Sequence, residues 1–353
     1  MIRWKFYLIL IFCTTKLSLG FGQKVPLDYS VFDNWKDIEG TTISNDGKYV
    51  VYALNPQEGD AQLMVLNMET DSIDTLARGI EPNISEDNQY LAFIIKPPLE
   101  LLKELRRKKT KSQDLPKDTL AIYNLQTKAI VKIPRVRFYR FPESASEWIA
   151  YQLERSIPTR SSSKKRRKKE GRFRDIDNGT TLVIRNLVSG LEFSYDYVTE
   201  FEISKNANDL IFASTGNDGD FHPGIYSFNL DSTYLHTVYS SRNGEYKNLS
   251  WDEQGEQAAF IADLDTTKSR VREYQLFYWK KGLNTATMMV NSLHPSLPLN
   301  WLISEYAIPE FSTDGTKLYF GTAPQPLLND TTLLPEEIVN VEVWSWKDGF
   351  IQP

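Results

Sequence analysis

Apolar and polar residues alternate along most of this chain, in short runs that are separated by polar turns. Within the runs the period is two, as at Leu63 and Val65 in "QLMVLN" or Leu182 and Ile184 in "TLVIRN". Alternation over runs of this length predicts β-strands, and the turn residues between them predict hairpins. The pattern therefore predicts an all-β chain.

A short motif recurs among these strands: an apolar residue, Ser, a polar turn with Asp or Gly, and an apolar strand. It is clearest in "ISNDGKYVVYAL" from Ile43 and "FSTDGTKLYFGT" from Phe311. Asp can bond its own backbone and Gly can take positive φ, so these are hairpin-turn residues rather than catalytic ones. The strand that follows the first turn is expected to pack inward with Val50 and Tyr52. The serines of the predicted repeats are Ser44, Ser85, Ser144, Ser204, Ser250 and Ser312.

Each motif is followed by two more strand-like runs, so every repeat reads as four strands when the strand leading into the serine is included. Inserts at 96–117 and 157–178 interrupt two repeats, which otherwise approach the roughly 40 residues of a propeller blade. Within the first insert, "PLELLKELRRKK" could form a short basic amphipathic helix. We predict a β-propeller of about six four-stranded blades over residues 23–353, with the last blade incomplete. A pair of β-sandwiches is the alternative architecture.

Residues 1–22 have the pattern of a signal peptide, with early cations, a short apolar run and small residues at the end. The run is shorter than a membrane-spanning helix needs. A permanent anchor, or a lipoprotein attached through Cys13, are the weaker readings. Loss of Arg3, Lys5 and Lys16 with this segment would change the formal charge from -5 to -8. We predict export to the periplasm or the medium without stable membrane insertion, and no disulfide in the mature chain, because Cys13 is the only cysteine.

Two features could carry chemistry, and each has a simpler interpretation. The basic run at 164–169 could bind phosphates, but in an acidic exported chain it is better explained as a solvated loop. Asp218, Asp220 and His222 could hold a cation, but they lack the remaining ligands of a calcium loop. Phosphate-binding and dinucleotide motifs are missing from the sequence. The sequence therefore nominates no catalytic, cofactor-binding or metal-binding residue, no cofactor and no nucleic-acid partner.

The repeats resemble the TolB-like blades in the N-terminal propeller of the prolyl oligopeptidase family of secreted bacterial serine peptidases. The resemblance rests on "WKDIEGTTISNDGKYVVY", on the lysine-rich insert ending in "LPKDTLAIYNL" and on "VEVWSWKDGFIQP", and it extends from about Tyr29 to Pro353. In this family the nucleophile lies in a C-terminal α/β-hydrolase domain, on a G-x-S-x-G elbow. This chain has no such segment, and its histidines are His222, His236 and His294. No catalytic residue of the family can be carried over.

The resemblance implies a non-catalytic propeller, truncated before the hydrolase domain, that would restrict the access of peptide substrates. Its partners would be a peptide and, in intact relatives, the chain's own hydrolase domain. A free-standing periplasmic propeller that binds proteins is the second hypothesis. An independent hydrolase is the third, although no nucleophile and base pair can be nominated for it.

Overall fold

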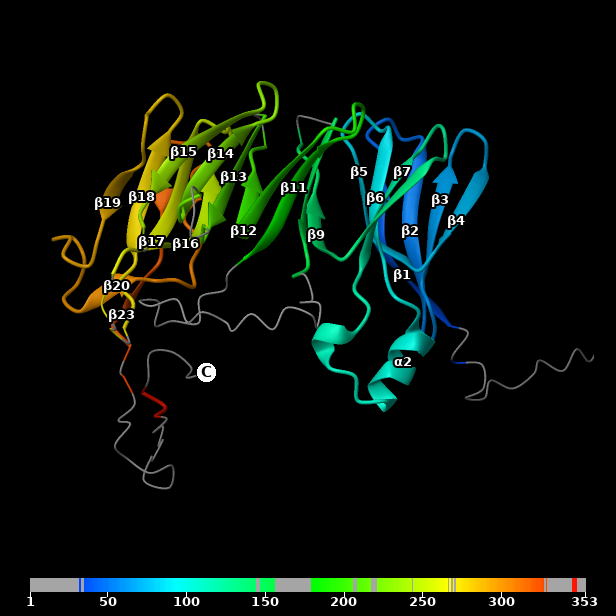
Figure 1. The fold of residues 1–353 in the computed structure, drawn as a ribbon, viewed down its shortest axis with the longest axis horizontal. Coiled ribbons are helices and arrows are strands. Elements are labelled where there is room, and N and C mark those ends of the chain that lie inside the picture. The colour runs from blue at the N-terminus through cyan, green and yellow to red at the C-terminus, as the bar shows by residue number, and fades with distance from the viewer. Residues whose placement is uncertain are drawn as a thin grey trace, which may run out of the picture. The chain divides into compact units, whose positions relative to one another are not determined.

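The computed structural model of this chain describes most of the predicted propeller region. The described residues are 32, 35–143, 147–155, 179–205, 208–216, 221–242, 244–265, 267, 269, 271–326, 328 and 345–347. They belong to two compact units: the described residues up to Pro82 with Phe93–Pro116, and Asn83–Ala92 with the described residues from Lys117 onward. Nearly all of the regular structure is antiparallel β-sheet, which confirms the all-β prediction (Figure 1).

The first predicted repeat is a four-stranded antiparallel sheet of the first unit, in the order β1-β2-β3-β4. Its strands are β1 (Lys36–Ile43), β2 (Tyr49–Pro56), β3 (Gln62–Asn67) and β4 (Ser72–Ala77). The prediction that Val50 and Tyr52 pack inward is wrong, because the buried residues of β2 are Val51 and Ala53. These two lie opposite the buried Val65 and Leu63 of β3, so Val50 and Tyr52 face the other side of the sheet.

The second repeat forms a sheet in the order β5-β6-β7-β8, also with four strands. Its strands are β5 (Gly79–Ile84), β6 (Tyr90–Ile95), β7 (Thr119–Asn124) and β8 (Ile130–Pro134). Four successive residues are buried in each of β6 and β7, so both faces of these middle strands are covered. A half-buried sheet would show alternation instead.

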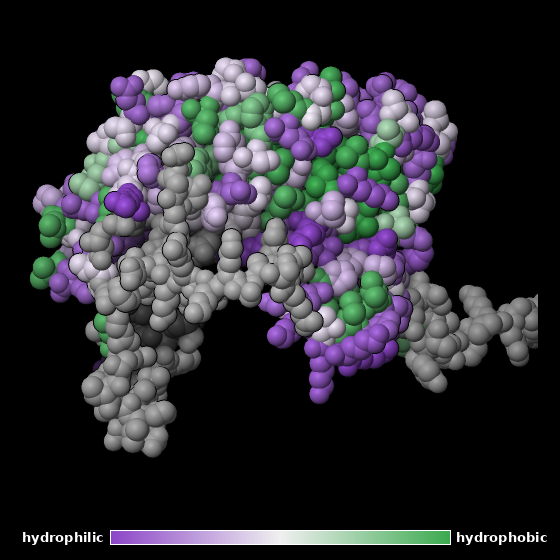
Figure 2. All heavy atoms as spheres, in the orientation of Figure 1, coloured by the Kyte–Doolittle hydropathy of each residue, from purple (hydrophilic) through white to green (hydrophobic). Residues whose placement is uncertain are grey.

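The first insert contains the expected short helix, α2 (Leu99–Arg107), followed by the 3₁₀ turn η2 (Ser112–Asp114). Asp60 accepts a hydrogen bond from the Leu99 amide at 2.9 Å, and Lys103 forms ion pairs with Glu58 and Glu100. None of the helical residues is fully buried, and Leu101 is exposed. Figure 2 shows the apolar side chains of α2 flanked by hydrophilic ones. The second insert, 157–178, lies outside the described residues.

The third and fourth repeats share one seven-stranded sheet in the order β15-β14-β13-β12-β11-β10-β9. Its strands are β9 (Val136–Arg140), β10 (Trp148–Leu153), β11 (Thr180–Asn186), β12 (Glu192–Ile203), β13 (Asp209–Ser214), β14 (Gly224–Asn229) and β15 (Tyr234–Ser240). The first half of β12 pairs with β11 and the second half with β13. Tyr197, at φ 64°, lies between the halves, as Arg78 and Arg135 at positive φ lie between β4 and β5 and between β8 and β9. The predicted blade boundary is therefore present as a bend within one strand.

The fifth repeat is again a four-stranded sheet, β16-β17-β18-β19. Its strands are β16 (Glu245–Trp251), β17 (Gln257–Asp263), β18 (Gln275–Lys280) and β19 (Thr287–Val290). The segment beyond it contains the short pairs β20 with β23 and β21 with β22. Their bounds are Trp301–Ile303 (β20), Glu310–Phe311 (β21), Leu318–Tyr319 (β22) and Thr322–Pro324 (β23). Most of "VEVWSW" is outside the described residues.

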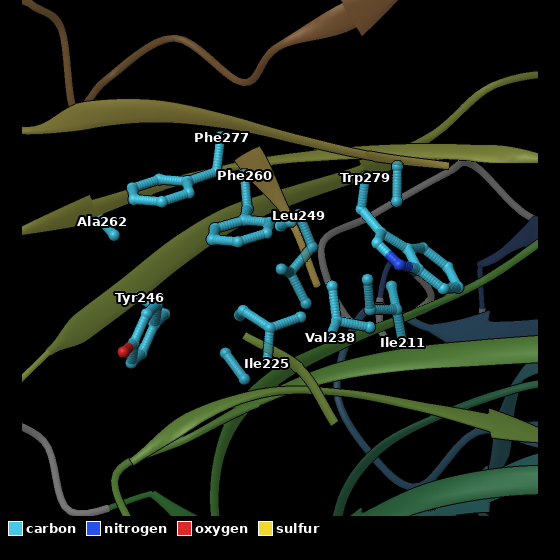
Figure 3. Close-up of a cluster of buried hydrophobic side chains, with 12 residues drawn as sticks. Ile211, Ile225, Val238, Tyr246, Leu249, Phe260, Ala262, Phe277 and Trp279 are labelled. Carbon is cyan, nitrogen blue, oxygen red and sulfur yellow. The ribbon is translucent and has the colours of Figure 1, made fainter. Parts of the chain in front are cut away.

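The aromatic core between the β9–β15 and β16–β19 sheets explains why the repeats stack. Phe260 and Phe277 have parallel rings 5.2 Å apart, and Tyr239 packs 4.6 Å from Phe277. Figure 3 shows this cluster, with residues from both sheets facing one another. The faces of neighbouring sheets thus exclude water together.

The motif serines form the predicted turns. Ser44 Oγ donates to Asp46 at 2.6 Å and accepts from the Tyr49 amide at 2.9 Å. The serine at position 85 makes the same two bonds within its own turn, and so does the serine at position 312. Gly47 takes φ 71° in the first turn and Asn88 takes φ 58° in the second, because both types tolerate the left-handed region.

The prediction that Ser250 forms the turn of the fifth repeat, as Ser44 does in the first, is wrong. The Asp252 amide donates to the Gln257 carbonyl at 2.9 Å, as the Ser44 amide donates to the Tyr49 carbonyl, and Asp252 Oδ1 accepts from the Gln257 amide at 2.9 Å. Asp252 therefore takes the place of the serine. Ser250 lies in β16, and its buried hydroxyl oxygen has no hydrogen-bond partner among the residues that the structure describes. A carboxylate accepts the same backbone bond as a hydroxyl. Ser144 lies outside the described residues.

The corrected anchor gives a test with an internal control. Asp252→Ala should lower the free energy of unfolding by about 2 kcal/mol, because buried backbone amides would lose their acceptor. Ser250→Ala should change it by less than about 0.5 kcal/mol, because that hydroxyl makes no hydrogen bond within the described ranges. Urea unfolding of both variants would measure this. A larger loss for Ser250→Ala would contradict the assignment.

Candidate functional site

The residues singled out from the sequence are scattered in the structure. Asp218 and Asp220 lie outside the described residues, as does the basic run at 164–169. The carbonyl of His222 accepts a hydrogen bond from the Tyr226 hydroxyl at 2.6 Å, and the half-buried His294 accepts one from the Ser296 amide at 3.3 Å. Over the described part of the chain, no three His, Cys, Asp or Glu side chains are grouped to hold a metal ion. In the same part, no helix is long and apolar enough to cross a membrane.

Charged side chains gather instead on the first strands of successive repeats in the second unit. Arg140 on β9 forms an ion pair with Glu202 on β12. Glu200, also on β12, accepts the Leu249 amide of β16 at 3.1 Å. Lys247 on β16 extends the series to Glu305, at 2.6 Å, beyond the fifth repeat. We call these five side chains, with Arg272, Tyr274 and Glu245, the first-strand network.

Glu200 is the most perturbed acid of the network. Burial raises its pKa from the ordinary 4.5 to about 7, and the negative charge of Glu202 adds to this effect. The Leu249 amide and the charge of Lys247 act in the opposite direction without cancelling it. Glu200 therefore exchanges its proton near neutral pH.

Two groups hold the Lys247 ammonium. Its Nζ lies 2.6 Å from Glu305 and 4.8 Å from the centre of the Tyr274 ring. Burial alone would lower the pKa of Lys247, but hydrogen bonds to Glu305 and Tyr274 outweigh it and the pKa is raised. Burial alone would raise the pKa of Glu305, but its bond to Lys247 lowers it. Both groups are therefore charged at neutral pH.

A bulge in β16 places these groups. The register of β16 against β17 shifts between Lys247 and Ser250, and Asn248 lies in the bulge at φ 57°. The Asn248 side chain donates to the carbonyls of Glu305 and Ala307 at 2.9 and 3.2 Å. The bulge thus fixes Lys247 to the segment that carries Glu305.

The other end of the network is similar in chemistry. Arg272 forms an ion pair with Glu245, and its Nη1 lies 3.4 Å from the Tyr274 hydroxyl. The network therefore presents guanidinium, ammonium and carboxylate groups, which suit noncovalent contacts to groups of either charge. Sequence reasoning missed it, because its members lie far apart in the chain. The polar residues of the first strands, such as those in "TEFEIS" and "GEYKNLS", were the available signal.

No family model and no curated protein matches this sequence. Among solved structures, the chain is similar to the β-propeller domain of the Trilobed protease from Pyrococcus furiosus, with 12% identity, 83% of this chain and 79% of that one covered, and a TM-score of 0.40. It is similar to Kuenenia stuttgartiensis hydrazine synthase at 12% identity, with 86% and 77% covered and a TM-score of 0.39.

A third similar structure is an acylaminoacyl peptidase in complex with Z-Gly-Gly-Phe-chloromethyl ketone, at 11% identity and a TM-score of 0.38. The match covers 80% of this chain and 43% of that one, so this chain spans less than half the length of the peptidase. The assignment of blades rests on the four-stranded sheets of this chain.

The raised pKa of Glu200 predicts a pH-dependent cost to stability. The folded state binds the Glu200 proton more tightly than the unfolded state, so protonation of Glu200 stabilises the fold at low pH. This stabilisation is lost as pH rises from about 4.5 through about 7. The loss is at most about 3 kcal/mol, since Glu200 is partly exposed. Glu200→Gln stays neutral at every pH. We expect the variant to equal the wild type below about pH 4.5 and to exceed it in stability above pH 7.

Urea unfolding of both proteins at a series of pH values would measure the difference. The difference in the free energy of unfolding between the two proteins isolates Glu200, because other groups titrate equally in both. A difference that stays constant from pH 5 to pH 8 would contradict the assignment.

Proposed function

We propose that this chain is the non-catalytic propeller portion of a prolyl-oligopeptidase-like serine peptidase, and that it binds extended peptide along the first-strand network. The observation that carries the proposal is that charged side chains of first strands meet across successive repeats, as in the pair of Arg140 and Glu202. Strands that meet in this way are the inner edges of stacked blades, and inner edges line the central channel of a propeller.

A peptide brings backbone donors and acceptors together with charges of both signs. The network offers partners for each, since it combines Arg140, Lys247 and Arg272 with four carboxylates. Most of these groups are already paired within the protein. Binding should therefore be weak, reversible and sensitive to salt, because screening reduces contacts between exposed charges.

Two measurements test the proposal, one of catalysis and one of peptide binding. The purified chain should not hydrolyse a chromogenic proline-containing peptide. It should bind a fluorescently labelled, unstructured peptide of mixed charge, with an affinity that falls as salt rises. Arg140→Gln should weaken this binding several-fold, whereas Arg185→Gln should leave it unchanged. Arg185 is a matched control, because it also pairs with a glutamate, Glu192, but lies on β11, away from the first strands.

Fluorescence anisotropy measures the binding, and an absorbance assay measures the hydrolysis. Hydrolysis that a serine-directed inhibitor abolishes would contradict the non-catalytic role. Binding of folded proteins without binding of the peptide would favour the free-standing protein-binding propeller.

We also propose that the chain is exported. The proposal is supported by the cations, apolar run and small residues of 1–22, which lie outside the described residues. Expression of the full chain in a Gram-negative host should yield periplasmic protein whose N-terminus is Gln23. Fractionation and N-terminal sequencing would test this. An uncleaved, membrane-bound product would contradict it.

A further inference from the structure

A pocket of about 330 Å³ lies on the second unit, away from the first-strand network. Its walls come from β13, β14 and β15 on one side and from the end of β18 and the following turn on the other. The volume is at the small end of the roughly 300–1,000 Å³ of ligand pockets. The pocket therefore suits a ligand of one or two rings.

A buried carboxylate, Asp209, stands in the wall of this pocket. The equivalent position in other repeats, five residues after the turn anchor, holds Tyr49, Tyr90, Gln257 or Lys317. Asp209 is only 3% exposed. Burying a charge is costly unless it is paired. The fourth repeat thus departs from the others by burying a carboxylate at this position, whereas the charged Lys317 is exposed.

Two groups satisfy this carboxylate. Lys281 Nζ, from the turn after β18, lies 2.5 Å from Asp209 Oδ2, and the Asn229 side chain donates to Oδ1 at 3.1 Å. The charges of Asp209 and Lys281 balance, so the wall is neutral overall. It still presents an ammonium donor, Lys281, and a side-chain amide, Asn229, within a small space.

An aromatic surface faces these polar groups. The His236 ring stacks on Trp279 at 5.7 Å, and the Trp279 indole is fixed by its hydrogen bond to the Leu283 carbonyl at 3.0 Å. Trp279 lies at the side of the aromatic cluster, apart from Phe260 and Phe277 (Figure 3). The pocket-lining Tyr234 is 64% exposed. His236 Nε2 is buried and, within the described part of the chain, has no hydrogen-bond partner.

We propose that this pocket binds a neutral saccharide ring. A balanced ion pair favours a neutral ligand, because an ionic ligand would have to displace one partner. Hydroxyl groups both donate and accept, so adjacent hydroxyls match the ammonium of Lys281 and the side-chain amide of Asn229 together. The apolar face of a sugar ring packs on Tyr234, which is an exposed aromatic surface.

The test uses the full chain and a panel of methyl glycosides of glucose, galactose, mannose and N-acetylglucosamine. N-acetyl-tyrosinamide represents the competing occupant, an aromatic peptide side chain. Ligand-observed NMR and calorimetry should detect saturable binding of at least one glycoside. Tyr234→Ala should weaken it about fivefold to tenfold through loss of the aromatic contact.

Tyr306→Ala is the matched control, because Tyr306 is 91% exposed and lies outside the pocket. It should bind the glycoside like the wild type. Asp209→Asn keeps the side-chain size but removes the charge that holds Lys281, so it should also weaken binding. Lack of saturable binding by all four glycosides would overturn the proposal. So would binding of N-acetyl-tyrosinamide alone, or glycoside binding that is equal in wild type and Tyr234→Ala.

Discussion

The central constraint on this structure is that the middle strands of its sheets are apolar on both faces. All four central residues of β6 and of β7 are buried, and every residue of β13 is buried. A single sheet in water would leave one of these faces exposed, at a cost of roughly 25 cal/mol for each Å² of apolar surface. The sheets must therefore stack face to face, and the aromatic cluster around Phe260 and Phe277 is such a junction.

Because the sheets stack by their faces, the two edges of each sheet have different surroundings. The fourth strands are mostly exposed, as the patterns of β4, β8 and β19 show, and polar residues suit that position. The first strands of neighbouring repeats approach one another, so their charges can pair across sheets, as Arg140 does with Glu202. The inner edge is thus where a polar surface can be kept partly buried, and the raised pKa of Glu200 is a direct result of that position. The same edge is where we place the proposed contacts with peptide.

The repeats keep a geometry while changing the residues that produce it. Ser44 and Asp252 hold equivalent turns, although one is a hydroxyl and the other a carboxylate. A second recurring feature is the asparagine that ends the third strand of a repeat. Asn67 accepts hydrogen bonds from the amides two and three residues after it, and Asn124 accepts the corresponding bonds in the second repeat. In the fourth repeat, Asn229 also donates to Asp209, which adapts this feature to the pocket. Local variation on a fixed frame is how such repeats can acquire individual sites.

The sequence by itself determined the strands, the four-strand repeat and the turns, because alternation and turn chemistry are local properties. It also predicted the short helix α2. It failed where equivalence depends on spatial register: Ser250 was chosen over Asp252, and Val50 over Val51, since a shift of one or two residues leaves the apolar pattern nearly unchanged.

Tertiary structure alone decided the candidate sites. Lys247 and Glu305 lie 58 positions apart in the chain, and Asp209 lies on β13 whereas Lys281 lies in the turn after β18 of another sheet. Charges so distant in sequence meet only after the sheets have stacked, so no local pattern could have paired them.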